Sequence, residues 1–147
     1  MSQKMSKEEY QSMVDRKSPS SKLLKNSIKA FLIGGTICTI GQCFLSFYQG
    51  IIPDKELAGS ATSITMILIG VLLTGFDIYP KIAKHGGAGT LVPITGFANA
   101  VSAPAIEAKT EGYILGVGAK IFTIAGPVIL YGTIASFCAG VIFYFMK

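Results

Sequence analysis

The sequence is poor in charged side chains, and this shortage bears first on the class of protein. Only 14% of its 147 residues are Asp, Glu, Lys or Arg, against about 25% in an ordinary soluble domain. Ten of the charged residues lie within the first 29 positions, so the remainder of the chain is poorer still. This distribution argues against a soluble enzyme.

Residues typical of metal sites and catalytic centres are also scarce. His85 is the single histidine, and no Walker motif or zinc-type spacing accompanies it. Asp77 follows an apolar run, as an aspartate of an intramembrane aspartyl protease would. Such a protease needs two aspartates, and no second one lies in an apolar run of this sequence. Cys38, Cys43 and Cys138 match no metal or redox spacing, so we interpret them as small buried hydrophobic residues. The sequence predicts no enzymatic activity, no catalytic residues, no cofactor and no metal site.

The sequence instead contains long runs without a charged residue. A membrane-spanning helix needs about 20 apolar residues, each adding about 1.5 Å. The mean hydropathy is +0.54, and we predict an all-α integral membrane protein with three to four transmembrane helices. Four windows contain no charged residue: 30–53, 57–76, 85–106 and 121–146.

The charge distribution also predicts the domain organisation. Residues 1–21 form a polar tail, and residues 22–147 form a membrane domain with spans at about 27–48, 58–76 and 120–145. Clustered basic residues before a first span mark the cytoplasmic side, so we expect a cytoplasmic N-terminus and no nucleic acid partner. Seven of the 13 basic residues precede that span: Lys4, Lys7, Arg16, Lys17, Lys22, Lys25 and Lys29.

The window from His85 to Ile106 is uncharged without being strongly apolar. It contains four glycines and two prolines, and backbone groups freed in hydrocarbon each cost several kcal/mol. We therefore predict a broken or re-entrant segment over about 86–106, largely irregular from Gly86 to Gly96, with a short helix from Phe97 to Val101. An interfacial loop is the alternative. A re-entrant segment leaves three spans and Lys147 outside, whereas a full crossing gives four spans and two cytoplasmic termini.

Polar side chains in this segment are candidates for a solute path or its gate. Thr90, Thr95 and Asn99 supply donors and acceptors at one depth, and the Glu107 carboxylate at its boundary could attract a cation. Asn99 has an alternative role in an interhelical hydrogen bond. Glu107 has one in a salt bridge with Lys109 or with a neighbouring subunit.

Two further sets of residues suggest how a path is entered and assembled. Lys81 and Lys84 could gather an anionic solute at a cytoplasmic mouth, or they could only anchor the topology. Three or four spans are too few to enclose a hydrophilic path, so a pore would form between subunits of a homo- or hetero-oligomer. Close helix packing is predicted along a face of small residues: Gly132, Ser136 and Gly140.

Two sequence blocks carry a resemblance to a known family. The run GGAGTLVPITGFANAVSAPAIEAKTEG (Gly86 to Gly112) and the run KAFLIGGTICTIGQ (Lys29 to Gln42) resemble the SpoVAC/SpoVAEB membrane protein family of endospore-forming bacteria. The resemblance covers about residues 22–145, and the second run favours the AC branch. The family offers no catalytic residues to carry over. Its distinctive positions in this sequence are Thr90, Pro93, Asn99 and Glu107.

The resemblance implies a function that composition does not show. It implies a subunit of a channel in the spore (forespore) inner membrane that moves dipicolinic acid, with calcium, during sporulation and germination. The partners implied are other SpoVA-type membrane subunits, and the channel would respond to membrane tension. A non-conducting subunit that scaffolds the complex is the alternative.

Overall fold

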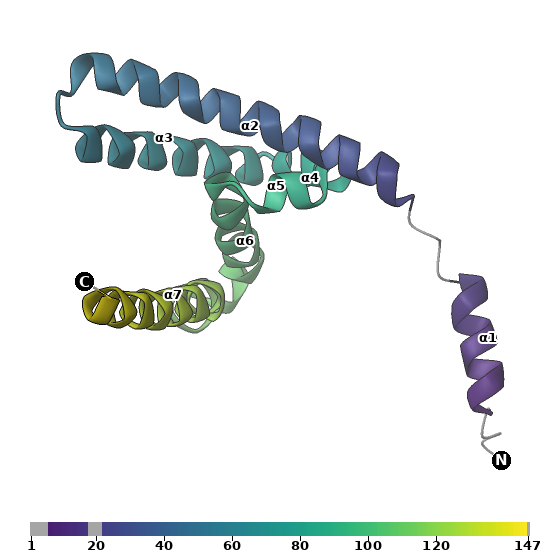
Figure 1. Ribbon diagram of the computed structural model, residues 1–147. Coiled ribbons are helices and arrows are strands. Elements are labelled where there is room, and N and C mark those ends of the chain that lie inside the picture. Colours follow the sequence, from purple (N-terminus) through teal and green to yellow (C-terminus); the bar gives the residue numbers. More distant parts are fainter. Residues whose placement is uncertain (1–5, 18–21, 147) are drawn as a thin grey trace.

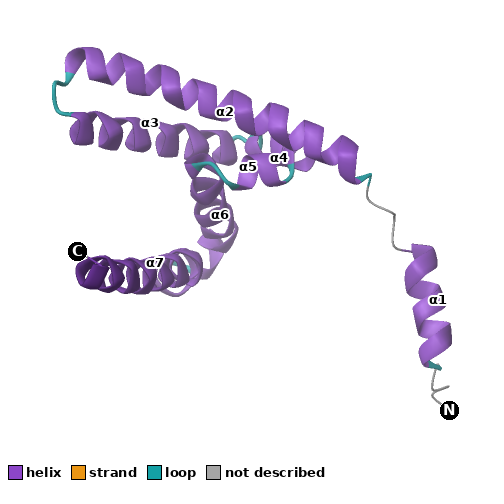
Figure 2. Cartoon of the chain, in the orientation of Figure 1, coloured by secondary structure: helices purple, strands orange, loops and turns teal. Residues whose placement is uncertain are grey.

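The computed structural model describes residues 6–17 and 22–146, and every regular element within those ranges is a helix (Figures 1 and 2). This confirms the predicted all-α class. Three helical stretches are long and apolar enough to cross a membrane: Leu23–Ile51, Lys55–Gly75 and Tyr113–Met146. In chain order the elements are α1 (Lys7–Lys17), α2 (Leu23–Ile51), α3 (Lys55–Gly75), α4 (Tyr79–Gly86), α5 (Ala88–Leu91), α6 (Ile94–Glu107), the 3-10 turn η1 (Ala108–Glu111), the π-helical turn η2 (Tyr113–Gly118) and α7 (Ala119–Met146).

The N-terminal part of the predicted tail contains a short helix. In α1 the Glu9 amide donates to Ser6 Oγ and the Ser6 amide donates to Glu9 Oε2, both at 3.2 Å. This reciprocal capping box satisfies two backbone donors that a helix start leaves free. Figure 1 shows α1 standing apart from the other helices. Residues 1–5 and 18–21 of the predicted tail lie outside the described residues.

Helices α2 and α3 form an antiparallel hairpin (Figure 1). Asp54 starts α3, because its Oδ1 accepts the Glu56 amide at 2.8 Å and the Leu57 amide at 3.3 Å. The connection after α2 is only three residues long, from Ile52 to Asp54. The Tyr48 and Thr65 hydroxyls, 2.8 Å apart, join the two helices. The predicted spans fall almost entirely within α2, α3 and α7, and their limits in the bilayer stay a prediction.

The buried core lies where α3, α4 and α6 meet. A Cβ on Gly70 of α3 would lie 3.1 Å from the Ala98 Cβ and 3.2 Å from the Thr95 Cα, so α6 packs directly on the α3 backbone. Most of the buried apolar side chains are alanines, which lets the backbones approach. The buried apolar residues are Ala58, Met66, Tyr79, Ala98, Ala105 and Ala108.

The predicted irregular stretch from Gly86 to Gly96 is wrong in extent. Only Gly87 and the pair Val92 and Pro93 interrupt the helices there. Gly87 has φ 49 and ψ −125, a conformation that suits glycine, and Pro93 lacks an N–H and precedes the first turn of α6. The short helix predicted from Phe97 to Val101 is likewise too short, because α6 has 14 residues and continues through Pro104.

Helix α6 is still too short to cross a bilayer alone. Fourteen residues span about 21 Å at 1.5 Å each, against about 30 Å of hydrocarbon. Among the described residues, α6 is absent from the helices with the length and hydropathy of a span. The interruptions at Gly87 and at Val92 and Pro93 make the segment a broken one, and whether it re-enters the membrane stays a prediction.

Helix α7 contrasts with this packed region. It contacts α6 and η2, and none of its residues from Ala119 to Met146 is buried. Figure 1 shows it set apart from the α2 and α3 hairpin, with α6 between them. The interpretation of the cysteines as buried is wrong for the single chain, because all three sit on exposed faces of α2 and α7: Cys38, Cys43 and Cys138.

Candidate functional site

The candidate site is the broken segment, which we define as residues 79–107 with helices α4, α5 and α6. Glycines dock it on α2. A Cβ on Gly89 would collide with the Ala30 carbonyl group, and a Cβ on Gly34 would lie 2.9 Å from the Gly89 oxygen. No other residue type permits so close a contact between two backbones. The glycines of this segment thus place it against the first long helix.

A buried hydroxyl network joins the two interruptions of the segment. The Tyr79 hydroxyl donates to the Thr90 carbonyl at 2.7 Å and lies 2.9 Å from Thr95 Oγ1. Because a tyrosine has one hydroxyl proton, the Thr95 hydroxyl donates to the Tyr79 oxygen. Thr90 Oγ1 in turn donates to the Gly87 carbonyl at 2.9 Å. One side chain from the start of α4 therefore fixes both the end of α5 and the start of α6.

A second polar contact links α3 to α6. Thr74 Oγ1 lies 2.7 Å from the Gly70 carbonyl and 2.9 Å from Asn99 Oδ1. Its single proton serves one of these acceptors at a time. Asn99 Oδ1 accepts from Thr74 when that proton turns away from the Gly70 carbonyl. Asn99 thus makes the interhelical hydrogen bond that was its alternative role.

The predicted path residues are not gathered around one open channel in the single chain. Thr90 and Thr95 are each only 3% exposed and are held in the hydroxyl network. Asn99 is half-buried, and Pro93 precedes α6. Glu107 ends α6, is exposed, and forms no ion pair within residues 6–17 and 22–146. Among these positions, Glu107 is the charged group open to an external ligand.

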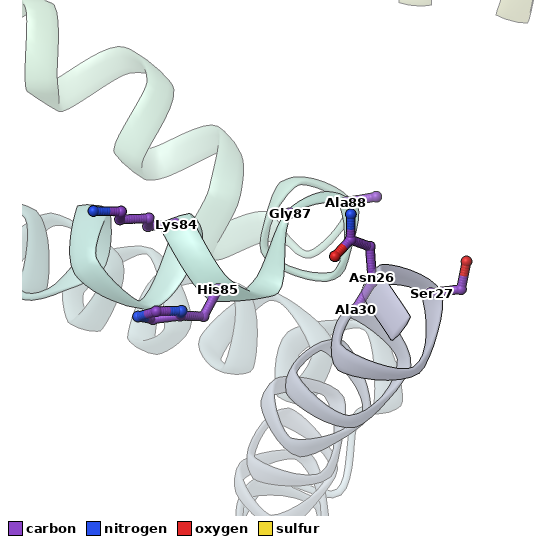
Figure 3. A pocket seen from close by; sticks show the side chains of 7 residues that line it. All are labelled: Asn26, Ser27, Ala30, Lys84, His85, Gly87 and Ala88. Carbon is purple, nitrogen blue, oxygen red and sulfur yellow. The ribbon is translucent and has the colours of Figure 1, made fainter. Parts of the chain in front are cut away.

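The predicted mouth lysines lie on α4 and are both exposed. Lys81 Nζ is 3.3 Å from Asp77 Oδ2, one turn earlier on the surface. Lys84 borders a pocket of about 290 Å³ between the start of α2 and the turn after α4 (Figure 3). Residues from both elements line it: Asn26, Ser27, Ala30, Lys84, His85, Gly87 and Ala88.

Sequence reasoning missed Tyr79. It precedes Pro80 at the start of α4 and is only 3% exposed. A buried tyrosine hydroxyl usually has a hydrogen-bond partner, but its partner here is a backbone carbonyl 11 residues later. The only feature of the sequence that pointed to this role was an amphipathic aromatic residue beside a glycine-rich segment.

The predicted packing face on α7 is free in the single chain. No described atom lies within 4 Å of a Cβ placed on Gly132 or Gly140. Ser136 between them is exposed as well. Whether these positions pack against another subunit stays a prediction.

Comparison with known proteins covers both the hairpin and the broken segment. A family described as SpoVAC/SpoVAEB sporulation membrane protein matches residues 26–142. Stage V sporulation protein AC of Bacillus subtilis (strain 168) is 46% identical over 137 residues, which is 92% of this chain and 91% of that protein. Both descriptions name a sporulation protein, and neither names an enzyme. No solved structure matches the chain significantly.

Proposed function

The chain belongs to the SpoVAC/SpoVAEB sporulation membrane protein family, and from this premise we propose that it is a subunit of a complex that moves dipicolinic acid, with calcium. The family supports a role in sporulation and a place in a membrane. The proposal adds the inner membrane of the spore, a cytoplasmic N-terminus, and other SpoVA-type membrane subunits as partners.

The observation that carries the proposal is the broken segment itself. Two helix interruptions, at Gly87 and at Val92 and Pro93, lie beside helices long enough to span a membrane. Pro104 inside α6 also has no N–H to donate to the Ala100 carbonyl. Discontinuous helices of this kind supply backbone groups to solutes in transporters and channels.

The path would lie between subunits. Three long apolar helices cannot enclose a hydrophilic route, and α7 leaves nearly all of its surface uncovered by the rest of the described chain. Glu107 at the end of α6 is open to a neighbour or a solute. Lys84 lies at the opposite end of the broken segment. An anion and its calcium could thus meet charges of both signs along one segment.

A specific observation favours a second candidate, a non-conducting structural subunit. Within the described residues, no buried side-chain nitrogen or oxygen lacks a hydrogen-bond partner. Thr90, Thr95 and Asn99 are all engaged inside the chain. On this view, the broken segment is a rigid docking module for other subunits.

The dipicolinic acid content of spores separates the two candidates. The variant carries Asn99→Leu and Glu107→Ala, and membrane abundance is measured alongside. The matched control carries Gln49→Leu and Glu56→Ala, two exposed polar residues near the α2 and α3 connection. We expect low dipicolinic acid at normal abundance for the first variant and normal content for the control. Normal content in both would remove these residues from conduction and favour the structural subunit.

A further inference from the structure

An apolar groove runs between α2 and α3 beside the broken segment and has a volume of about 310 Å³. Its floor is buried, with Met66 at 6% exposure and Tyr79 and Thr95 at 3%. Thr36 and Ile40 at its edge are exposed, so the groove opens sideways from the hairpin. Four helices contribute its lining: Ile33, Thr36, Ile37, Ile40, Met66, Ile69, Leu73, Tyr79, Ile82 and Thr95.

Basic residues continue the two walls of the groove at one end. On α2, Lys29 precedes Ile33 by four positions and Thr36 by seven, so the three share one helix face. On α4, His85 follows Ile82 by three positions and shares its face in the same way. Lys29 and His85 are both exposed. The groove is therefore apolar along its length and cationic at the end nearest the N-terminus of α2.

A pocket of mixed polar and apolar lining is at the same end. It is the pocket of about 290 Å³ between α2 and the turn after α4, and His85 and Lys84 line it. In Figure 3 the Lys84 and His85 side chains extend from α4 to one side, while Asn26 reaches from α2 toward Gly87 and Ala88. The pocket is thus bordered by residues that carry amide, ammonium and imidazole groups, with Lys84 and His85 extending to the side away from Asn26.

The groove together with Lys29 beyond its end matches the depth of one leaflet of a bilayer. Lys29 and Ile40 are 11 positions apart on α2, or about 16 Å at 1.5 Å per residue. Half of the hydrocarbon core is about 15 Å thick. A ligand that fills the groove and reaches the basic end is therefore an amphiphile with an anionic head.

We propose that this groove binds one acyl chain of an anionic phospholipid, with its phosphate held at the basic end by Lys29 and His85. A small soluble dicarboxylate has no acyl chain to extend along the groove. The basic end distinguishes the lipid from an apolar helix of a second copy, which would not use it. Because Tyr79 and Thr95 form part of the groove floor and also join the end of α5 to the start of α6, the lipid would contact the broken segment directly.

The test measures lipid retained by the full chain purified in detergent, by native mass spectrometry after exchange into phosphatidylglycerol or phosphatidylcholine. We expect the wild type to retain phosphatidylglycerol preferentially. Lys29→Gln with His85→Gln should reduce that preference about fivefold or more, since a basic residue near an anionic surface contributes about that factor. Lys55→Gln with Lys120→Gln, at exposed positions away from the groove, is the matched control.

Filling the groove tests the acyl chain separately. Thr36→Phe and, independently, Ile40→Phe place a ring at the exposed edge, where folding tolerates it, and each should lower retention of both lipids. Unchanged phosphatidylglycerol preference in the Lys29 and His85 variant would overturn the proposal. So would competition by soluble glycerol phosphate at equal affinity, or a lipid-free dimer that Thr36→Phe dissociates. None of these readouts uses dipicolinic acid, so the result is independent of the proposed transport function.

Discussion

The broken segment and α7 are both rich in small residues, yet the chain uses them in opposite ways. In the broken segment, a Cβ on Gly89 would strike Ala30, and one on Gly96 would strike the Thr90 carbonyl. On α7, a Cβ on Gly132 or Gly140 would meet no described atom within 4 Å. Small residues therefore mark a close contact within the chain in the broken segment, whereas close packing of α7 against another subunit stays a prediction.

The difference separates the forces that fold the chain from those that assemble it. The broken segment is held by internal contacts and by a closed set of hydrogen bonds around Tyr79. Helix α7 holds to the rest through η2 and α6, and its apolar surface faces outward. We expect substitutions in the first region to lower the stability of the single chain and those in the second to affect only its assembly.

The largest effect on the single chain is expected from Gly89→Leu. The new side chain would enter the Ala30 backbone, which cannot move aside as a flexible side chain would. Overpacking of this kind costs about 1–3 kcal/mol, and a backbone obstacle places it at the upper end. The measurement is the thermal unfolding midpoint of the purified chain in detergent.

Gly35→Leu is the control for that change. Gly35 lies on α2 beside Gly34, and a Cβ placed on it would meet no described atom within 4 Å. The same leucine should leave the midpoint close to that of the wild type. Equal losses in Gly89→Leu and Gly35→Leu would show that the glycine contact on α2 does not hold the segment.

Tyr79→Phe should have the next largest effect. It removes two buried hydrogen bonds and leaves the Thr90 carbonyl and the Thr95 hydroxyl without that partner. Leaving buried polar groups unpaired costs about 1–3 kcal/mol. Tyr131→Phe makes the same change on α7, where the side chain is 70% exposed, and should leave stability unchanged. Both variants are measured by denaturant unfolding in mixed micelles. Equal losses in the free energy of unfolding would contradict the comparison.

Asn99→Leu should cost less than Tyr79→Phe. Thr74 keeps the Gly70 carbonyl as an acceptor when the amide is lost, so only one hydrogen bond of about 0.5–1.5 kcal/mol disappears. The midpoint of thermal unfolding should fall by less than in Tyr79→Phe. A larger fall would mean that the Thr74 and Asn99 pair, and not Tyr79, joins α6 to the hairpin.

The smallest effect on the single chain is expected from Gly132→Leu with Gly140→Leu. Both side chains point into space that the described chain leaves open, so the thermal midpoint should not change. Assembly should fall, because close packing of α7 against a neighbour would be blocked. Cross-linking in membranes measures it, and intact assembly in this variant would remove the small-residue face from the interface.

Hydropathy alone was sufficient to locate the long helices, because α2, α3 and α7 are each set by an uncharged run. The glycine and proline content of the broken segment predicted too long an irregular stretch, for a physical reason. Glycine and proline usually end helices, but Gly86, Gly89 and Gly96 are needed here for contact with neighbouring backbone and side chains. The sequence therefore predicted a break correctly and overestimated its length.

The candidate site was only partly predictable. Thr90, Thr95 and Asn99 were identified as polar groups in an apolar setting, and the structure gives each a partner inside the chain. Their partners come from Tyr79 and Thr74, which lie outside the glycine-rich window, and from Gly87 within it. The contacts with Tyr79 and Thr74 depend on tertiary packing of α6 against α3 and α4, which no local pattern encodes.

The shortness of α4 and α5 has a consequence for biogenesis. They have 8 and 4 residues, and isolated helices under about 12–15 residues are marginal. They can therefore form only on a surface that already exists, and α2 and α3 supply that surface. Since the ribosome makes the hairpin first, α2 and α3 are available before α4 and α5 are synthesised. A defect in the hairpin would therefore also prevent α4 and α5 from forming.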